Sequence, residues 1–278
     1  WNRLTICQTY MILGGVRYYL SLLDNNLGLP ANVDRLFFSD DAELAGEYER
    51  LFSSLFRNPQ PYKDIIRLLT DNKSGLTRKE ISSKLGKESG GNLSKMLTNL
   101  ENCDFLRKYN VREKKINSNN GIYQLTDFYV RFYNDFCRLH STDSHYWSNS
   151  LNTPKQNNWY GLAYERLCMA HVQQIKQALG IAGIRTEYYS WRSKQSKPAA
   201  QVDLIIERAD DIVNLCEIKY SRGKYTIDAN EEAKLRNRIT DFEQETGLKK
   251  AIQLTMITTY GLNENAHSYE VAASLDMN

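Results

Sequence analysis

The 278-residue sequence lacks any long apolar run. No stretch approaches the ~18 consecutive apolar residues that a membrane-spanning helix needs. The first residues also lack the basic segment followed by an apolar core that marks a secretion signal. These two absences predict a soluble chain that has no membrane partner and works in the cytoplasm.

Cysteines are few and scattered. The five of them lie far apart and form no CxxC pair, and their total is odd. A disulfide framework needs paired cysteines, and a zinc knuckle needs closely spaced ones, so the sequence argues against both. A reducing compartment fits this pattern best.

Neither charge nor a nucleotide-binding motif assigns a function. The net charge is +3, so any nucleic-acid surface must come from local clustering of basic residues. No GxxxxGK[ST] motif is present; the nearest approach, Gly86-Lys87, continues into Glu88. We therefore expect no ATP hydrolysis by this sequence. Its length exceeds the usual ~100 to 200 residues of one domain, which predicts two or three units.

Residues 1–57 are expected to form a small helical unit. Apolar residues in its last helix recur at spacings of three and four, which is typical of an amphipathic helix. They are Leu44, Tyr48, Leu51, Phe52 and Leu55. The sequence opens on Trp1 inside a periodic apolar segment, so we expect a fragment of a longer protein.

Residues 58–140 have the spacing of a winged-helix domain. Thr77 to Glu80 has the pattern of a capping box and is expected to start the second of three helices. The third helix carries a buried stripe from Leu93 to Leu100. A hairpin of residues 105–111 and 121–125 around the tip Asn117–Asn120 would form the wing.

Basic residues on this third helix and wing are the candidates for binding nucleic acid. They are Lys95, Arg107, Lys108, Arg112, Lys114 and Lys115. In a duplex-binding domain the helix enters the major groove and the wing contacts phosphates. The alternative is that this domain serves only as a protein-docking module or a spacer.

After a polar stretch at 141–158, expected to be a linker, residues 159–278 predict an α/β unit. A helix from about 159 to 180 precedes strands at 185–191, 201–207, 212–219 and 251–257, with a helix at 228–245 before the last strand. This pattern predicts a mixed sheet flanked by helices. The fold class of the whole chain is therefore multidomain, α followed by α/β.

Three charged residues interrupt the apolar strands of this unit. Because side chains alternate along a strand, Glu217 and Lys219 share a face. A short hairpin would bring Asp203 from the preceding strand close to Glu217. Two carboxylates beside the carbonyl of Ile218 suit Mg²⁺ or Mn²⁺, which prefer oxygen ligands. The alternative is a salt-bridge cluster at a strand edge.

These residues resemble the PD-(D/E)XK nuclease superfamily, in which an acid on one strand is followed by acid-x-Lys on the next. Here they are Asp203 and Glu217-Ile218-Lys219, with Val202 where the family's name has proline. Glu165 matches the helix glutamate of many members. The resemblance implies a restriction-endonuclease-like fold in which Asp203, Glu217 and Glu165 bind the metal. Lys219 would orient the attacking water, making all four residues catalytic.

The first part of the chain resembles the lid of archaeal-type AAA+ ATPases. The resemblance rests on Tyr10–Leu20, with Arg17 in place of a proline, on Leu36–Phe38 and on Glu47–Leu51. In that family the lid leads into a winged helix and a nuclease-like domain. The resemblance implies that ATP binds only in an N-terminal ATPase domain outside this sequence, which would be this chain's partner. An oligomer is compatible with it.

The sequence thus predicts a metal-dependent phosphodiesterase acting on nucleic acid, with DNA preferred. The alternative is an inactive nuclease-fold module that binds nucleic acid or a partner protein and regulates the ATPase. Gln201 and Tyr220 are further candidates for lining the site. Lys224, Lys234, Arg236 and Arg238 would either follow a phosphate backbone or form a solvated charged face, since acidic residues intersperse them.

Overall fold

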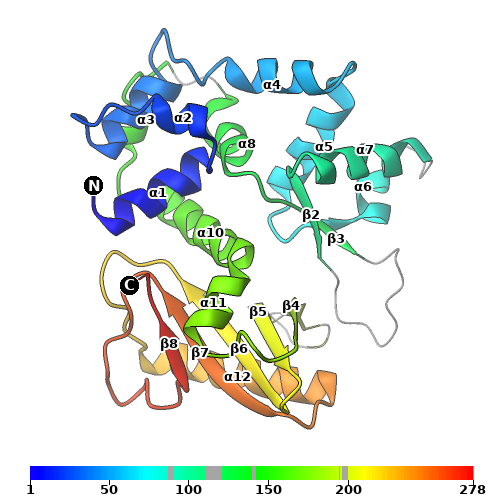
Figure 1. Cartoon of the computed structure of the whole chain (residues 1–278), viewed down its shortest axis with the longest axis vertical. Helices are drawn as coiled ribbons and strands as arrows, with labels where there is room; N and C mark the ends of the chain where they lie inside the picture. The colour runs from blue at the N-terminus through cyan, green and yellow to red at the C-terminus, as the bar shows by residue number, and fades with distance from the viewer. Residues whose placement is uncertain (87–90, 110–120, 140–141, 194, 196–199, 278) are drawn as a thin grey trace. The chain divides into compact units, whose positions relative to one another are not determined.

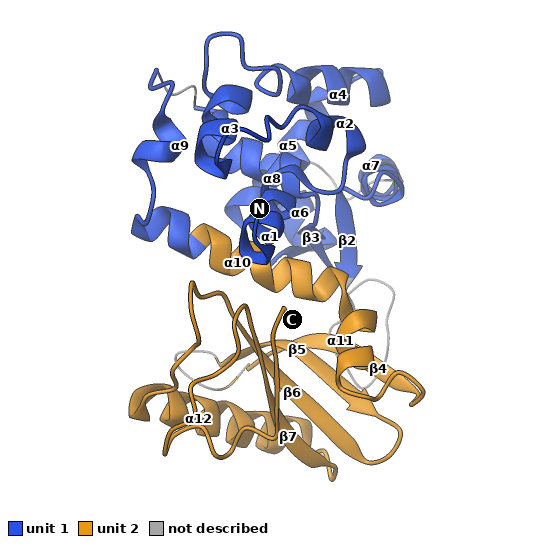
Figure 2. Cartoon of the chain, turned by 60° about the vertical axis from the view of Figure 1, so that its left-hand side comes forward, with its two compact units in different colours: residues 1–158 blue, residues 159–278 orange. Residues whose placement is uncertain are grey.

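The computed structural model describes residues 1–86, 91–109, 121–139, 142–193, 195 and 200–277. The chain divides into two compact units, residues 1–158 and 159–278 (Figure 2). The first unit contains helices and a three-stranded sheet, and the second contains helices and a five-stranded sheet, so the architecture is mixed α/β.

The first unit opens with α1 (Arg3–Leu13), α2 (Arg17–Ser21), α3 (Leu29–Phe37) and α4 (Glu47–Leu55). The side chain of Asn2 caps α1 by accepting a 2.8 Å hydrogen bond from the backbone N–H of Thr5. The helix ends at Gly14, whose φ of 67° is a conformation that favours glycine. Pro30 lies in the first turn of α3, where a missing N–H costs nothing.

Short helices alternate with a small sheet in the next part of this unit. The elements are α5 (Gln60–Asp71), β1 (Leu76–Thr77), α6 (Arg78–Lys84), α7 (Gly91–Asn102), β2 (Leu106–Tyr109) and β3 (Ile122–Leu125). The sheet order is β1-β3-β2, with antiparallel pairs throughout. The capping box predicted at Thr77 and Glu80 is confirmed at the start of α6.

Aromatic packing joins residues 1–57 to residues 58–140. Helix α8 (Phe128–Phe132) and the π-helical turn Tyr133–Cys137 pack on the first helices. The rings of Tyr48 and Tyr133 stack with centroids 4.4 Å apart, and those of Phe52 and Phe105 stack at 5.2 Å. The two segments that were predicted to be separate domains therefore belong to one compact unit.

The segment after residue 141 differs from the expected linker. It contains α9 (Tyr146–Asn149), and the side chain of Trp147 is fully buried between the rings of Phe132 and Phe136. The buried carboxylate of Asp34 accepts a 2.8 Å hydrogen bond from the backbone N–H of Trp147 and contacts Ser148. Residues 142–158 are thus not a solvated linker, because burial of a tryptophan stabilises a packed conformation.

The second unit begins within α10 (Pro154–Ala170), which α11 (Val172–Ala178) follows. The single helix expected from about 159 to 180 therefore starts earlier and is interrupted at His171, whose backbone (φ −117°, ψ 31°) is not helical. The sheet contains β4 (Thr186–Arg192), β5 (Gln201–Arg208), β6 (Ile212–Lys219), β7 (Ala251–Thr258) and β8 (Ala273–Leu275).

The sheet of the second unit is mixed, as predicted. Its order is β4-β5-β6-β7-β8; β4, β5 and β6 pair antiparallel, whereas β6, β7 and β8 pair parallel. Helix α12 (Ala229–Thr246) provides the crossover from β6 to β7. It starts at Asp228, whose side chain accepts a 2.8 Å hydrogen bond from the backbone N–H of Glu231. It ends at Gly247 in the left-handed conformation.

The core of this unit lies between the sheet and α12. Leu235 and Phe242 of the helix pack against a cluster that includes Val213 and Leu215 of β6 and Met256 of β7. Six consecutive residues of β6 are buried, so both faces of this central strand are covered. Figure 1 draws α11 and α12 on opposite sides of the sheet.

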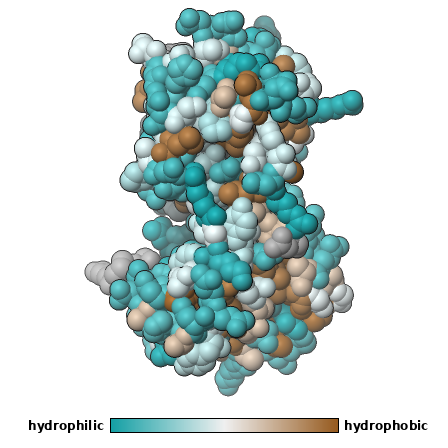
Figure 3. Space-filling view, turned by 90° about the vertical axis from the view of Figure 1, so that its left-hand side faces the viewer, coloured by the Kyte–Doolittle hydropathy of each residue, from teal (hydrophilic) through white to brown (hydrophobic). Residues whose placement is uncertain are grey.

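The helices of the described residues are all too short or too polar to cross a lipid bilayer. On the face drawn in Figure 3, hydrophilic residues cover most of the surface, and hydrophobic residues form separate patches.

Candidate functional site

Asp203 lies at a bulge in β5. Tyr189 pairs with Ile205 and Trp191 pairs with Val202, so one residue of β4 opposes two residues of β5. The one residue is Ser190, whose hydroxyl donates a 2.8 Å hydrogen bond to the backbone carbonyl of Asp203. Bulges occur often beside active sites because they change the direction of a side chain.

Glu217 lies next to Asp203 across the β5–β6 ladder. Leu204 pairs with Cys216 and Ile205 pairs with Leu215. Continuing this register by one residue sets the backbone of Asp203 opposite that of Glu217. Directly opposed residues in antiparallel strands have Cβ atoms only about 5 Å apart. The two carboxyl groups that sequence reasoning paired therefore come from neighbouring positions.

The carboxylate of Glu217 is buried between two cations. Only 3% of this residue is exposed. Lys219 Nζ lies 2.9 Å from Oε1 of Glu217, and Arg238 Nη1 lies 2.6 Å from Oε2. Lys219 also lies 2.9 Å from Oε1 of Glu231. Burial of a charge is costly unless it is paired, and both oxygens of Glu217 are paired here.

Glu231 and Arg238 were not predicted as site residues. Together with Leu235 and Phe242 they recur at spacings of four, three and four residues along α12, which places all four on one side of the helix. Leu235 and Phe242 pack into the core, so the two charged residues share the inward stripe. That spacing is the signal in the sequence that identifies them.

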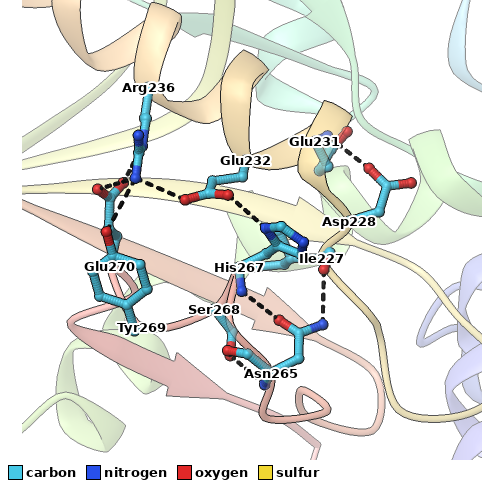
Figure 4. A network of polar contacts seen from close by, with 10 residues as sticks. All are labelled: Ile227, Asp228, Glu231, Glu232, Arg236, Asn265, His267, Ser268, Tyr269 and Glu270. Atoms are coloured by element: carbon cyan, nitrogen blue, oxygen red, sulfur yellow. Dashed lines mark hydrogen bonds and ion pairs between the residues drawn. The ribbon is translucent and has the colours of Figure 1, made fainter.

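A network on another face of α12 fastens the helix to the loop before β8 (Figure 4). Glu232 forms a 2.8 Å ion pair with Arg236 and contacts Nδ1 of His267 at 2.6 Å. Arg236 also pairs with Glu270 at 2.8 Å. In the same loop, Asn265 donates a 2.9 Å hydrogen bond to the backbone carbonyl of Ile227, just before the helix. The ion pairs of this network therefore lie on a different side of the helix from Leu235, Arg238 and Phe242.

Glu165 of α10 joins the same electrostatic cluster. Burial raises the pKa of Glu165, and the charge of Glu217 raises it further, whereas Arg166 and Lys219 oppose the shift. Burial likewise holds the pKa of Asp203 well above its usual range, and the charges of Glu165 and Glu217 add to this effect. Carboxyl groups influence one another in this way only at short range. The four residues predicted to be catalytic thus influence one another's ionisation, and the prediction that they form one catalytic site remains a prediction.

For the two cations of the site, neighbouring charges have a larger combined effect on the pKa than burial has. Burial alone would lower the pKa of Lys219, but the negative charges of Glu217 and Glu231 outweigh burial and raise it. Burial is also the largest single effect on the pKa of Arg238, but the charge of Glu217, a hydrogen bond to it, and the charges of Glu231 and Asp203 together outweigh burial and raise the pKa. Both side chains therefore stay protonated at neutral pH.

The chemistry of this donor set fits a divalent cation. Carboxylates of Asp203, Glu217 and Glu165 and the carbonyl of Ile218 are hard oxygen donors of the kind that Mg²⁺ and Mn²⁺ prefer. The raised pKa values of Asp203 and Glu165 reflect burial first, and the negative charge of neighbouring carboxylates adds to it. Within the described residues, however, no three Asp, Glu, His or Cys side chains already surround a common point. The ion pairs with Lys219 and Arg238 are consistent with this result, because they direct the two oxygens of Glu217 toward cations and not toward the other carboxyl groups.

Aromatic residues border the site. Tyr220, directly after Lys219, stacks on the buried ring of Tyr160 with centroids 5.2 Å apart and meets Tyr164 edge to face. Lys219 lies 6.0 Å from the ring centroid of the partly exposed Tyr225. The candidate Gln201 lies at the start of β5 and is exposed.

The predicted nucleic-acid-binding residues are described in part. Lys95 on α7 is exposed. Arg107 and Lys108 on β2 are partly buried, and Lys108 Nζ lies 5.7 Å from the ring centroid of Tyr123. The remaining candidates and the expected tip lie outside the described residues; they are Arg112, Lys114, Lys115 and Asn117–Asn120.

Comparisons with known proteins do not assign a family. No family model and no curated protein matches the sequence. A solved structure described as a protein of unknown function, AF1548, is 19% identical over 37% of this chain and 54% of that one, with a TM-score of 0.28. The match thus spans about half of that protein, and at this TM-score it supports no statement about fold or activity.

Proposed function

We propose that residues 159–278 form a metal-dependent phosphodiesterase domain with a restriction-endonuclease-like fold, acting on nucleic acid and preferring DNA. One observation carries the proposal: Glu165 of α10, Asp203 of β5, and Glu217 and Lys219 of β6 influence one another's ionisation. A cluster of buried carboxyls beside a lysine is costly to fold, and such groups are concentrated at functional sites.

In this proposal each residue has a distinct role. Asp203 and Glu217 hold the divalent cation, and Glu165 completes the set directly or through water. When bound, a divalent cation would supply Lewis-acid polarisation of the phosphate and a lower pKa for a water molecule. Lys219 orients that water and stabilises negative charge on the phosphate.

The first unit is proposed to connect this domain to an ATPase. The order α5, β1, α6, α7, β2, β3, with an antiparallel sheet, supports a winged helix in residues 58–140. Lys95, exposed on the third helix of that set, supports DNA contact by this unit. Residues 1–57 are proposed as the lid of an AAA+ ATPase whose ATP-binding domain is the partner of this chain.

A second candidate function is a module that binds nucleic acid or protein without cleaving it. The ion pairs of Glu217 favour it, because Lys219 and Arg238 already neutralise the principal metal ligand. Titration calorimetry with Mn²⁺ separates the two candidates. The first predicts binding by the wild type that Asp203→Ala removes, whereas the second predicts no binding by either protein.

Cleavage is tested on branched, single-stranded and linear DNA, with matched RNA, in Mg²⁺ or Mn²⁺. Glu217→Gln and Asp203→Asn should each lower the rate by on the order of 100-fold or more, because a metal contributes several kcal/mol to the barrier. Glu232→Gln is the matched control, since it lies on α12 and pairs with Arg236 and His267. Equal rates for Glu217→Gln and the wild type would discard the catalytic assignment.

A further inference from the structure

Arg238 pairs with a carboxylate oxygen of Glu217 that would have to be free if Glu217 binds a metal. Its Nη1 lies 2.6 Å from Oε2 of Glu217, and its side chain is 23% exposed. The contact is an ion pair between opposite charges, and a divalent cation would compete with Arg238 for this carboxylate oxygen.

Lys219 and Arg238 differ in whether each keeps an ion-pair partner when Glu217 moves away. Lys219 has a second carboxylate, since Nζ lies 2.9 Å from Oε1 of Glu231. For Arg238, Glu217 is the one carboxylate within ion-pair distance among the residues that the structure describes. Lys219 can thus release Glu217 and keep a partner, whereas Arg238 cannot.

A released Arg238 needs a new anion. A partly buried cation without a partner is costly, and nearby Asp203 and Glu165 would be engaged with the same cation as Glu217. The planar guanidinium matches the paired oxygens of a phosphodiester better than an ammonium does. Such an ester is the group that the proposed function places beside the cation.

We propose that Arg238 couples metal binding to phosphodiester binding: it neutralises Glu217 in the metal-free site and transfers to a non-bridging phosphate oxygen when Glu217 takes the metal. This inference rests on the proposed function. It assigns a positioning and substrate-binding role to a residue of α12 that the four-residue site does not include. Because linkage is reciprocal, each ligand then strengthens the binding of the other.

The test measures the Kd of Mn²⁺ by electron paramagnetic resonance, with and without dimethyl phosphate at constant ionic strength. Dimethyl phosphate is a phosphodiester without base or sugar. In the wild type we expect the diester to tighten Mn²⁺ binding by roughly fivefold or more, the usual lower range of coupling. In Arg238→Gln, Mn²⁺ alone should bind more tightly than in the wild type, and the diester should change its Kd by less than about twofold.

Two further variants complete the experiment. Arg236→Gln is the matched control on α12, because Arg236 pairs with Glu232 and Glu270 and not with Glu217; it should keep the wild-type coupling. Arg238→Lys keeps the charge but not the planar fork, so its coupling should lie between those of the wild type and Arg238→Gln. It also serves if the glutamine variant does not fold.

The outcomes distinguish this inference from the proposed function. Undiminished coupling in both Arg238 variants, or weaker Mn²⁺ binding by Arg238→Gln alone, would overturn the role of Arg238 and leave the metal site standing. Absence of Mn²⁺ binding in the wild type and in Arg236→Gln, with and without the diester, would overturn both.

Discussion

The hydroxyl of Ser190 donates a 2.8 Å hydrogen bond to the backbone carbonyl of Asp203, at the point where one residue of β4 opposes two of β5. This bond fixes the bulge from the side of the neighbouring strand. It therefore contributes to the direction of the Asp203 side chain without contacting its carboxyl group.

Replacing Ser190 by alanine should weaken metal binding without removing a ligand. We expect the Kd of Mn²⁺ to rise by roughly tenfold, the lower range for loss of a group that orients a metal ligand. The stability cost should be only about 1 kcal/mol, the net contribution of one hydrogen bond. Thr240→Ala, on the exposed side of α12, is the control, and equal Mn²⁺ affinity in both variants would contradict the role of Ser190.

The raised pKa of Asp203 predicts how stability depends on pH. Burial and neighbouring negative charges favour its protonated form in the folded protein. The folded state thus binds more protons than the unfolded state between about pH 4 and the raised pKa, so this group's contribution to stability is lost as pH rises through that range. In EDTA, Asp203→Asn should flatten that decline and be the more stable protein at pH 8. Urea denaturation from pH 5 to 8 measures the difference; parallel curves would rule it out.

A second carboxyl gives a separate prediction in the first unit. Burial raises the pKa of Asp127 from 3.8 to about 6, although its side chain caps α8 by accepting a 2.7 Å hydrogen bond from the backbone N–H of Val130. Ionisation of Asp127 is therefore harder in the folded than in the unfolded protein. Above about pH 6, where Asp127 is charged, this costs roughly 3 kcal/mol of stability at 1.36 kcal/mol per pKa unit. Asparagine also caps helices, so Asp127→Asn should stabilise the protein at pH 7 by up to that amount and little at pH 4. A variant less stable at pH 7 would contradict this.

Trp147 should contribute to the stability of the first unit like a core residue. Because its side chain is fully buried, Trp147→Ala should cost about 3 to 5 kcal/mol in denaturant unfolding. Trp1→Ala is the control, since Trp1 is 49% exposed and its loss should stay within about 0.5 kcal/mol. A similar small effect of both substitutions would mean that residues 142–158 do not pack as described.

The sequence was most informative where a pattern repeats locally. The strands from Gln201 to Arg208 and from Ile212 to Lys219 are runs of β-forming residues joined by a short turn, which is why their bounds and the approach of Asp203 to Glu217 were predictable. The three-residue strand Ala273–Leu275 was not, since its pairing with β7 depends on distant residues.

The roles of the charged residues of α12 could not be predicted from composition alone. Glu231 and Arg238 lie among other charged residues, so their segment was equally consistent with a solvated face. Their spacing to Leu235 and Phe242, which pack in the core, is the signal that the sequence analysis did not use. Trp147 was missed for a similar reason, because its polar neighbours concealed one buried ring.

The strands of the second sheet follow one another in space in the same order as along the chain. A ribosome therefore releases this sheet from one edge to the other, and each strand can pair with its predecessor soon after it emerges. The steps from β6 to β7 and from β7 to β8 are the exceptions, because a parallel pair requires a longer connection first, which for β7 includes the whole of α12. Until then β6 presents an open apolar edge, so slow translation between Tyr220 and Lys250 would expose the nascent chain to aggregation.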